Sequence, residues 1–142
     1  MVPHRPKPPP PARRFRRTRA AHRTELAEDY VETILDLIDE DGDARLTEIA
    51  ARLGVAHPTV SKALRRLQVE GLVALRPYRW VGLTAAGERL AKACRARHLR
   101  VVAFLQALGL NRQTAETDAE GIEHHVSTNT LRAMERFTKG RR

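Results

Sequence analysis

Two carboxylates and an imidazole are grouped at helical spacing near the C-terminal end of the chain. In the run EGIEHH at residues 120–125, a helix would place Glu120, Glu123 and His124 within about 100° of arc on one face. Carboxylate oxygens and imidazole nitrogens that converge in this way bind divalent metal ions, and the hard oxygens favour manganese or iron over softer metals. His125 points elsewhere and is expected to be a structural hydrogen-bond donor. The run therefore predicts part of a divalent-metal site.

An acidic stripe lies near the other end of the chain. The stretch 24–48 carries ten carboxylates and a single cation. In a helix, Glu25, Asp29, Glu32 and Asp36 would fall at i, i+4, i+7 and i+11 along one side. Like charges at this spacing repel one another by a few tenths of a kcal/mol per pair, so a buried stripe needs compensating positive charge. An acidic stripe on its own is most often a solvated surface, and that interpretation stays open.

His98 is the third candidate ligand, in the middle of the apolar face of a predicted helix over 84–108. Taken alone, a histidine in this position is most often a core residue. If the two acidic groups meet in the fold, His98 becomes the neutral nitrogen ligand beside them. Cys94, one helical turn away, is expected to pack in the core. Because it is the single cysteine of the chain, no intrachain disulfide can form, which favours a cytoplasmic location.

The stretch 49–67 has the pattern of a helix-turn-helix. Gly54 can adopt the left-handed conformation that ends the first helix, and proline suits the first turn of the second. The exposed face of the second helix has short side chains at its start and cations beyond, which suits the major groove of double-stranded DNA. The alternative is a helical hairpin with a solvated basic face. The residues expected to contact DNA are Pro58, Thr59, Ser61, Lys62, Arg65 and Arg66, with Arg76 and Arg79 on the hairpin that follows.

Hydrophobic periodicity predicts the elements that position these side chains, and most of them are helices. The predicted helices cover 24–40, 46–53, a stretch starting at 58, 84–108, 112–125 and 128–138. Their predicted N-caps include Thr24, Thr84, Asn111 and Ser127. Two short apolar runs, 72–75 and 81–83, predict the β-hairpin of a wing. The expected fold is mainly α: a winged helix-turn-helix DNA-binding domain over 24–84, then an α-helical metal-binding and dimerisation domain over 85–142.

Residues 1–23 are predicted to form a disordered basic arm. They hold eight basic side chains, no acidic one and six of the eight prolines, and they supply almost all of the formal net charge of +9. This charge favours a polyanionic partner, so the arm is expected either to contact the DNA backbone or simply to aid solubility. The longest wholly apolar run, 101–105, is far short of the roughly 20 residues that a membrane span needs. No membrane partner is therefore expected.

The order of these motifs resembles the manganese transport regulators of the diphtheria toxin repressor family. The resemblance covers residues 24–139 and is carried by EDYVE at 28–32, the winged helix-turn-helix, Arg97-His98 and DAEGIEHH at 118–125. It implies a bacterial, homodimeric, metal-activated regulator that binds a palindromic operator and most often represses manganese-uptake genes. It also implies a site for two Mn²⁺ ions per subunit, with Glu32 and Glu123 bridging them. The implied metal ligands are Asp29, Glu32, His98, Glu120, Glu123 and His124.

The ligand types favour manganese within this family. The iron-responsive branch carries sulfur side chains at the positions of Asp29 and Glu120, and carboxylates there favour the harder, more weakly bound manganese. An iron-responsive regulator that binds Fe²⁺ stays an alternative. The wing departs from the family pattern, because Trp80 stands where relatives often have glycine and Gly82 is displaced.

Two other classes of function compete with this interpretation. A carboxylate-bridged di-metal enzyme would use similar ligands, but its usual Glu-x-x-His pair is missing, because Glu120 is followed at i+3 by Glu123. The chain also lacks the common hydrolase, phosphate-loop and dinucleotide-binding motifs, so no enzymatic activity and no small-molecule substrate are expected. The second class is a DNA-binding module controlled by a protein or an organic ligand, in which the acidic side chains stay solvated.

Overall fold

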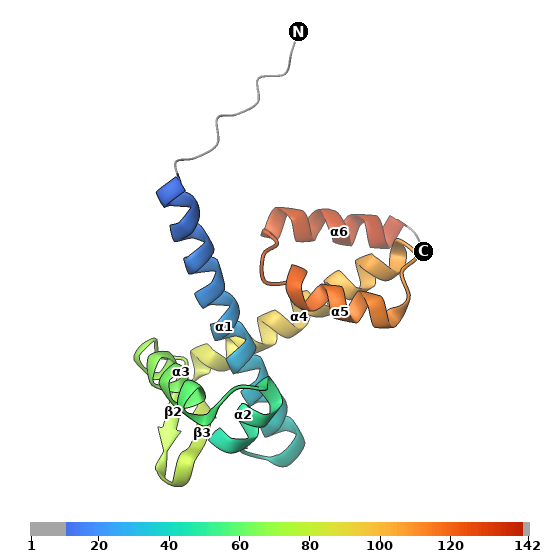
Figure 1. Cartoon of the computed structure of the whole chain (residues 1–142). Helices are drawn as coiled ribbons and strands as arrows, with labels where there is room; N and C mark the ends of the chain where they lie inside the picture. The colour runs from blue at the N-terminus through green and yellow to red at the C-terminus, as the bar shows by residue number, and fades with distance from the viewer. Residues whose placement is uncertain (1–10, 141–142) are drawn as a thin grey trace.

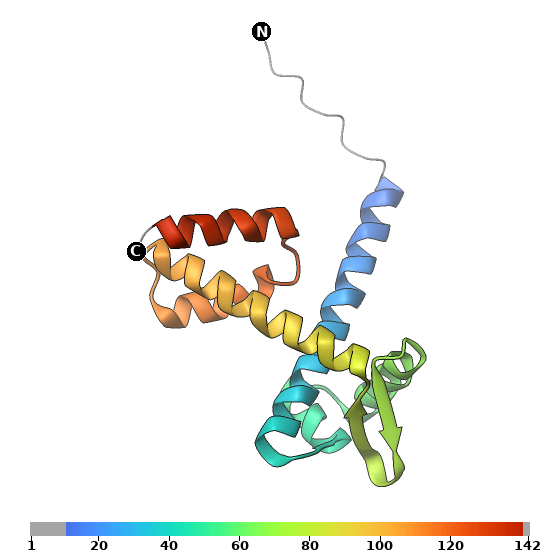
Figure 2. The same cartoon turned by 180° about the vertical axis from the view of Figure 1, so that it is seen from behind.

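The computed structural model describes the backbone of residues 11–140 and the side chains of residues 19–140. Figures 1 and 2 show two lobes joined by one long helix, α4, which runs from the sheet of the first lobe into the second. The elements of the first lobe are α1 (Pro11–Asp41), β1 (Ala44–Arg45), α2 (Leu46–Leu53), α3 (His57–Val69), β2 (Val73–Arg76), the short 3-10 turn η1 (Pro77–Arg79) and β3 (Trp80–Leu83). The elements that follow are α4 (Ala85–Ala107), α5 (Arg112–Ile122) and α6 (Thr128–Gly140).

Helix α1 begins at Pro11 rather than at Thr24. Proline is well tolerated at the start of a helix, and the residues that follow it up to Thr24 are mostly arginine and alanine, which have high helix propensity. The hydroxyl of Thr24 does not cap the helix and instead donates to the carbonyl oxygen of Ala20 at 3.0 Å. The prediction of disorder is therefore wrong for residues 11–23, whereas residues 1–10 lie outside the described part of the chain.

The first lobe has the predicted helix-turn-helix and a small sheet. Helix α2 ends at Gly54, which has a φ of 68° in the left-handed region as predicted. Helix α3 packs Val60 and Leu64 against Ile34 of α1 and Ile49 of α2, and these four side chains are fully or almost fully buried. The antiparallel sheet has the strand order β1-β3-β2, so β3 is central. The core therefore holds α3 at a fixed angle to α1.

The wing is formed by β2 and β3, which pair from Val73 opposite Leu83 to Arg76 opposite Trp80. Tyr78, at its tip, is 89% exposed. Trp80 is half-buried, and the guanidinium carbon of Arg45 lies 4.0 Å from the centre of its ring. This cation–π contact joins β1 to the start of β3, next to the tip of the wing.

Helix α4 packs on both lobes. Thr84 caps it, since its hydroxyl oxygen accepts from the backbone N–H of Gly87 at 3.1 Å. The first half of α4 packs Ala91 against Val31 and Leu35 of α1, and the second half packs on α5 and α6. The predicted caps Asn111 and Ser127 are also confirmed, with side-chain oxygens that accept from the N–H groups of Thr114 and Thr130 at 2.8 and 3.2 Å. Among the described helices, none combines the length and apolar character of a membrane span.

A methyl group at Gly87 is expected to be strongly destabilising. A Cβ at this position would lie 2.0 Å from the carbonyl oxygen of Leu72, where α4 packs closely on the chain before β2. Because that backbone cannot move freely, Gly87→Ala is expected to lower the free energy of unfolding by about 1–3 kcal/mol. Urea denaturation measures the change. The matched control is Gly121→Ala in α5, which meets nothing within 4 Å and is expected to be neutral or stabilising. Equal stability of the two variants would contradict the close approach.

Candidate metal centre and DNA interface

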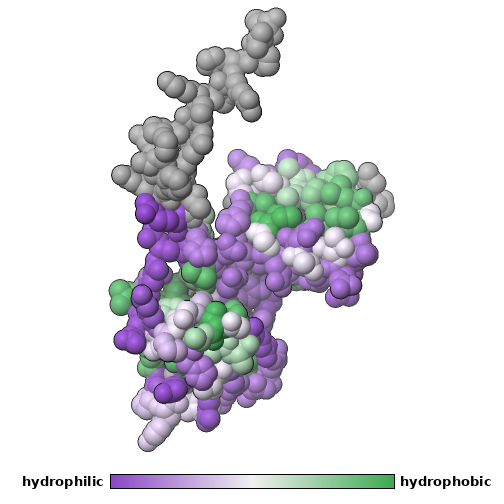
Figure 3. All heavy atoms as spheres, in the orientation of Figure 1, coloured by the Kyte–Doolittle hydropathy of each residue, from purple (hydrophilic) through white to green (hydrophobic). Residues whose placement is uncertain are grey.

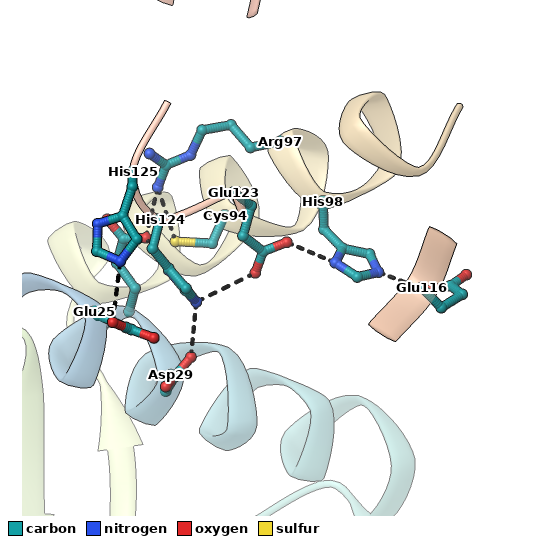
Figure 4. Close-up of polar contacts among 10 residues, drawn as sticks. Glu25, Asp29, Cys94, Arg97, His98, Glu116, Glu123, His124 and His125 are labelled. Carbon is teal, nitrogen blue, oxygen red and sulfur yellow. Dashed lines mark hydrogen bonds and ion pairs between the residues drawn. The ribbon is translucent and has the colours of Figure 1, made fainter. Parts of the chain in front are cut away.

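The six residues predicted to bind metal line one cleft of about 490 Å³. Figure 4 shows this region, where α1, α4 and the end of α5 meet. The contributing residues are Asp29 and Glu32 from α1, His98 from α4, Glu120 from α5, and Glu123 and His124 immediately after α5. The acidic stripe of α1 thus faces the imidazoles and the 120–124 segment. The two acidic groups therefore meet beside His98, which is the condition that the sequence analysis set for a common metal site.

His98 lies between two carboxylates. Its Nδ1 is 2.6 Å from Oε2 of Glu123, and its Nε2 is 2.6 Å from Oε2 of Glu116 (Figure 4). Burial of the ring opposes protonation, but the bonds to Glu116 and Glu123 outweigh it and raise the pKa of His98. Glu116 was not among the predicted site residues, although helical spacing places it one turn before Glu120 on the same side of α5.

His124 contacts both lobes. Its side chain is only 2% exposed; Nδ1 lies 2.7 Å from Oε2 of Glu28, and Nε2 lies 3.0 Å from Oδ1 of Asp29. Oε1 of Glu123 is 3.5 Å from the same Nε2. One imidazole therefore joins α1 to the segment after α5, and its Nε2 faces the cleft.

Buried Glu28 and partly buried Arg97 form an ion pair that was not predicted from the sequence. Oε2 of Glu28 accepts from Nη2 of Arg97 at 2.7 Å, and Glu28 is 3% exposed. Burial opposes ionisation of Glu28, but the bonds from His124 and Arg97 prevail and lower its pKa. Helical spacing is the signal in the sequence that could have indicated the burial of Glu28. Glu28 precedes Val31 by three residues and Leu35 by seven. It therefore shares the face of α1 that packs on α4.

Glu25 is a further residue that can hold a cation. One ligand atom each from Glu25, Asp29 and His124 lie within 4.8 Å of one another. Oε2 of Glu25 is also 3.2 Å from Nε2 of His125, the histidine expected to be a structural donor. Glu25 belongs to the predicted acidic stripe but was not predicted to be a ligand.

The electrostatics of the cleft fit a divalent cation. Burial raises the pKa of Asp29 and Glu32, and it raises the pKa of Glu123 to about 7 even though His98 acts in the opposite direction. Loss of solvent therefore disfavours the ionised form of these carboxylates, and a cation bound beside them would stabilise that form. Hard oxygen atoms with two imidazoles are a ligand set suited to manganese or iron.

The residues predicted to contact DNA lie on α3 and the wing. Most of them are exposed and Ser61 is half-buried. Two of the cations have partners within α3 or at its end: Arg65 donates to the hydroxyl of Ser61 at 3.3 Å, and Arg66 pairs with Glu70 at 3.4 Å. Thr59 and Lys62 are exposed on the same helix. This face of α3 therefore presents short and cationic side chains, as the sequence predicts.

Two family models match consecutive parts of the chain. Residues 22–81 match the DNA-binding domain described as "Iron dependent repressor, N-terminal DNA binding domain". Residues 84–141 match "Iron dependent repressor, metal binding and dimerisation domain". The predicted fold class, a DNA-binding unit followed by a metal-binding and dimerising unit, agrees with these matches.

Individual relatives give the same result. "Transcriptional regulator MntR" of Escherichia coli O6:H1 is 54% identical over 125 residues, which cover 88% of this chain and 81% of the relative. "HTH-type transcriptional regulator MntR" of Bacillus subtilis strain 168 is 36% identical over 108 residues, 76% of each chain.

Solved structures agree at lower identity. "Structure of the manganese regulator SloR" has a TM-score of 0.69 and 28% identity, covering 80% of this chain and 53% of that one. "Manganese-dependent transcriptional repressor complex with manganese" has a TM-score of 0.69 and 30% identity, covering 80% and 52%. The chain spans about half the length of these two matched structures. Together with the family models and the relatives, these matches show that the chain belongs to the iron-dependent repressor family of DNA-binding transcriptional regulators.

Proposed function

We propose that the chain is a manganese-responsive repressor that binds a palindromic operator as a homodimer in the cytoplasm and controls manganese-uptake genes. One observation carries the proposal: carboxylates and imidazoles that are able to bind a metal, from the DNA-binding lobe and from the second lobe, face one another in a single cleft. The relatives named as manganese regulators support the choice of metal. Because the matched relatives are named as regulators, we propose a regulatory role without turnover of a substrate.

The proposed ligands are those that line the cleft from both lobes: Asp29, Glu32, His98, Glu120, Glu123 and His124. We propose that they hold two ions per subunit, with Glu32 and Glu123 shared between them. Bound divalent cations would supply the positive charge that offsets these carboxylates. Asp29 and Glu120 favour Mn²⁺ over Fe²⁺, because they offer hard carboxylate oxygens at the positions where the iron-responsive branch has sulfur. Glu25 is close enough to Asp29 and His124 to be a further ligand.

The cleft residues couple the two lobes through α1. Asp29 and Glu32 stand on the same helix whose buried residues, such as Ile34, pack on α3. Repulsion between these carboxylates and Glu123 opposes close approach of the lobes when the negative charge is not offset. The position of α1 against the second lobe then sets the position of α3. In a homodimer this fixes the distance between two recognition helices, which must match half-sites about one helical turn apart.

The second lobe offers the surface for dimerisation. Figure 3 shows apolar residues gathered over α6 and the neighbouring end of the lobe. Leu99 of α4 and Leu108 at the C-cap of the same helix are 61% and 53% exposed. Leu131 of α6 is 5% exposed and packs in the core of its own lobe, so it holds α6 in place and is not itself part of the exposed surface. The apolar character of this lobe suits burial against a second copy.

A selection experiment tests the proposed function. A random duplex library is incubated with the purified protein, either with Mn²⁺ or with a chelator, and the retained sequences are determined. We expect a two-fold symmetric sequence to be enriched with Mn²⁺ only. Metal content and oligomeric state of the same preparation are measured together, and we expect two Mn²⁺ per subunit in a dimer. Enrichment of the same sequence with the chelator would contradict metal control of DNA binding.

The basic segment at the N-terminus and helix α3 are expected to contribute differently to DNA binding. Deletion of residues 1–20 removes seven basic side chains. We expect weaker binding to all sequences, with a salt slope that falls by about 0.9 for each phosphate that the protein no longer neutralises. Thr59→Ala is expected instead to change which sequences are preferred, because a short side chain there can contact base edges. Fluorescence anisotropy over a salt series measures both effects.

The matched control for the deletion keeps the chain length. Replacing Arg13, Arg14, Arg16, Arg17 and Arg19 by glutamine retains helix-forming residues and removes five charges. This variant is expected to reproduce most of the loss in salt dependence. If the deletion and Thr59→Ala changed sequence preference to the same extent, the division of roles would be wrong.

A further inference from the structure

Glu28, Arg97 and His124 form a largely buried chain of polar contacts that joins α1 to the second lobe. Oε2 of Glu28 lies 2.7 Å from Nη2 of Arg97 and 2.7 Å from Nδ1 of His124. The side chains of Glu28 and His124 are 4% and 2% exposed. Glu28 belongs to α1 of the DNA-binding lobe, whereas Arg97 is on α4 and His124 follows α5. Glu28 is not among the residues that line the metal cleft.

The two nitrogen atoms of His124 face different surroundings. Nδ1 lies 2.7 Å from Oε2 of Glu28. Nε2 turns toward Asp29 and Glu123 in the cleft, as Figure 4 shows. An ionised carboxylate can only accept a hydrogen bond, so Glu28 requires a proton on Nδ1. In the neutral imidazole, the lone pair is then on Nε2 and points into the cleft.

We propose that Glu28 and Arg97 are positioning residues that fix the tautomer and the orientation of His124 for metal binding through Nε2. This inference rests on the proposed function, because it assigns His124 to a metal. Arg97 acts through Glu28: its guanidinium donates to Oε2 of Glu28 at 2.7 Å and holds the carboxylate in place. A carboxylate that holds the far nitrogen of a metal-binding histidine sets the direction of its lone pair and raises its basicity.

The surroundings of Arg97 support a specific role for this pair, because its side chain is 24% exposed but its Nε atom is buried. Within the described part of the chain, Nε of Arg97 is the one buried side-chain nitrogen or oxygen without a hydrogen-bond partner. Nη2 of the same guanidinium contacts Sγ of Cys94 at 3.4 Å in addition to Glu28. A buried donor without a partner is costly, so general stabilisation of the α1–α4 contact is a poor reason to keep this arginine there.

A second ion pair between the same two helices provides the matched control. Arg95 of α4 pairs with Asp36 and Asp39 of α1, and all three side chains are more than a third exposed. A pair of this kind is weak, because solvent screens both charges. It joins α1 to α4 without contacting either nitrogen of His124. Arg95→Gln therefore tests for a general effect of loosening the two helices.

The first measurement is made on the metal-free protein. Long-range ¹H–¹⁵N correlation of ¹⁵N-labelled histidine, at a pH where His124 is neutral, reports which ring nitrogen carries the proton. We expect the Nδ1–H tautomer in the wild type. Glu28→Gln fills the same space but can donate as well as accept, so we expect a mixture of tautomers. Arg95→Gln is expected to leave the wild-type tautomer unchanged.

The second measurement is Mn²⁺ affinity by isothermal titration calorimetry. We expect Glu28→Gln to weaken Mn²⁺ binding by about 10–100-fold, and Arg97→Gln to weaken it by a smaller factor. Arg97→Lys retains the charge and is expected to recover part of that loss. Arg95→Gln is expected to stay within about threefold of the wild type.

The outcomes separate this inference from the proposed function. If wild-type protein bound no Mn²⁺, the proposed function would fail, whatever the tautomer of His124. If wild-type protein bound Mn²⁺ but carried the proton on Nε2, the positioning role would be wrong. The positioning role would also be wrong if the Glu28→Gln variant folded and bound Mn²⁺ with the affinity of the wild type. If Glu28→Gln failed to fold, Arg97→Lys and Arg97→Gln would decide, because equal and unchanged affinities in both would exclude a role for Arg97.

Discussion

Glu123→Gln is expected to bind Mn²⁺ on the order of a hundredfold or more weakly than the wild type, with DNA binding that no longer responds to the metal. Glu123 is the 3% exposed carboxylate that approaches both histidines of the cleft, at 2.6 Å from His98 and 3.5 Å from His124. Removing its charge removes the proposed bridge between the two ions and leaves a neutral amide, a much weaker ligand for a hard cation. Calorimetry with Mn²⁺ and anisotropy with the selected duplex measure the two effects.

The matched control is Glu116→Gln. Glu116 contacts the other nitrogen of His98 at 2.6 Å, but it is half-exposed and does not line the cleft. We expect a loss of Mn²⁺ affinity of about tenfold, the low end of what the loss of a supporting carboxylate costs, because the side chain of Glu116 is 39% exposed and water can take its place beside His98. Equal losses in the two variants would contradict the assignment of Glu123 as a bridging ligand.

Glu123→Gln is expected to stabilise the metal-free protein at neutral pH. Burial raises the pKa of Glu123 from 4.5 to about 7, so the folded state holds its proton more tightly than the unfolded chain does. The contribution of Glu123 to stability is therefore greatest below pH 4.5 and is lost as the pH rises through about 7. Glutamine stays neutral, so Glu123→Gln should flatten this decline. Thermal melting in chelator between about pH 5 and 8 tests the sign, and a variant less stable than the wild type at the upper end of this range would contradict it.

The sequence was sufficient to predict that the six candidate ligands converge on one cleft, because helical periodicity fixes which side chains share a face. Asp29 and Glu32 lie on one side of α1, and Glu120 and Glu123 lie on one side of the run that ends α5. His98 lies where the two acidic groups meet. The turn at Gly54 and the cap at Thr84 were predicted for a similar reason, since both depend on the residues next to them.

The features that were missed depend on contacts between elements that are distant in sequence. Glu28 and Arg97 are separated by 69 positions, and each alone is typical of a solvated charge. Only the packing of α1 on α4 shows that Glu28 is buried and that Arg97 is partly buried beside it. The start of α1 was missed for the opposite reason: the six prolines dominated the composition of the arm, although residues after Pro11 are good helix formers. The contact of Arg45 with Trp80 likewise depends on strand pairing between β1 and β3.

Operator DNA is expected to tighten Mn²⁺ binding by the same factor by which Mn²⁺ tightens DNA binding. The two sites share α1, which carries Asp29 and Glu32 on one side and packs Ile34 against α3 on another. If metal binding favours one arrangement of the lobes and DNA favours the same one, the two binding free energies are coupled, and thermodynamic linkage makes the coupling reciprocal. A factor of about 5–150 is typical of such coupling.

Four titrations on the wild-type protein measure the coupling in both directions. They give the affinity for Mn²⁺ with and without the selected duplex, and the affinity for the duplex with and without Mn²⁺. A duplex of the same composition and scrambled sequence is the control, since it measures nonspecific attraction of Mn²⁺ to the protein–DNA complex. We expect the two coupling factors to agree with the selected duplex and to fall to about one with the scrambled duplex. DNA binding that is equally tight and equally specific with and without Mn²⁺ would show that the cleft does not control α3. In that case the acidic face of α1 would have to serve a purpose other than sensing a metal.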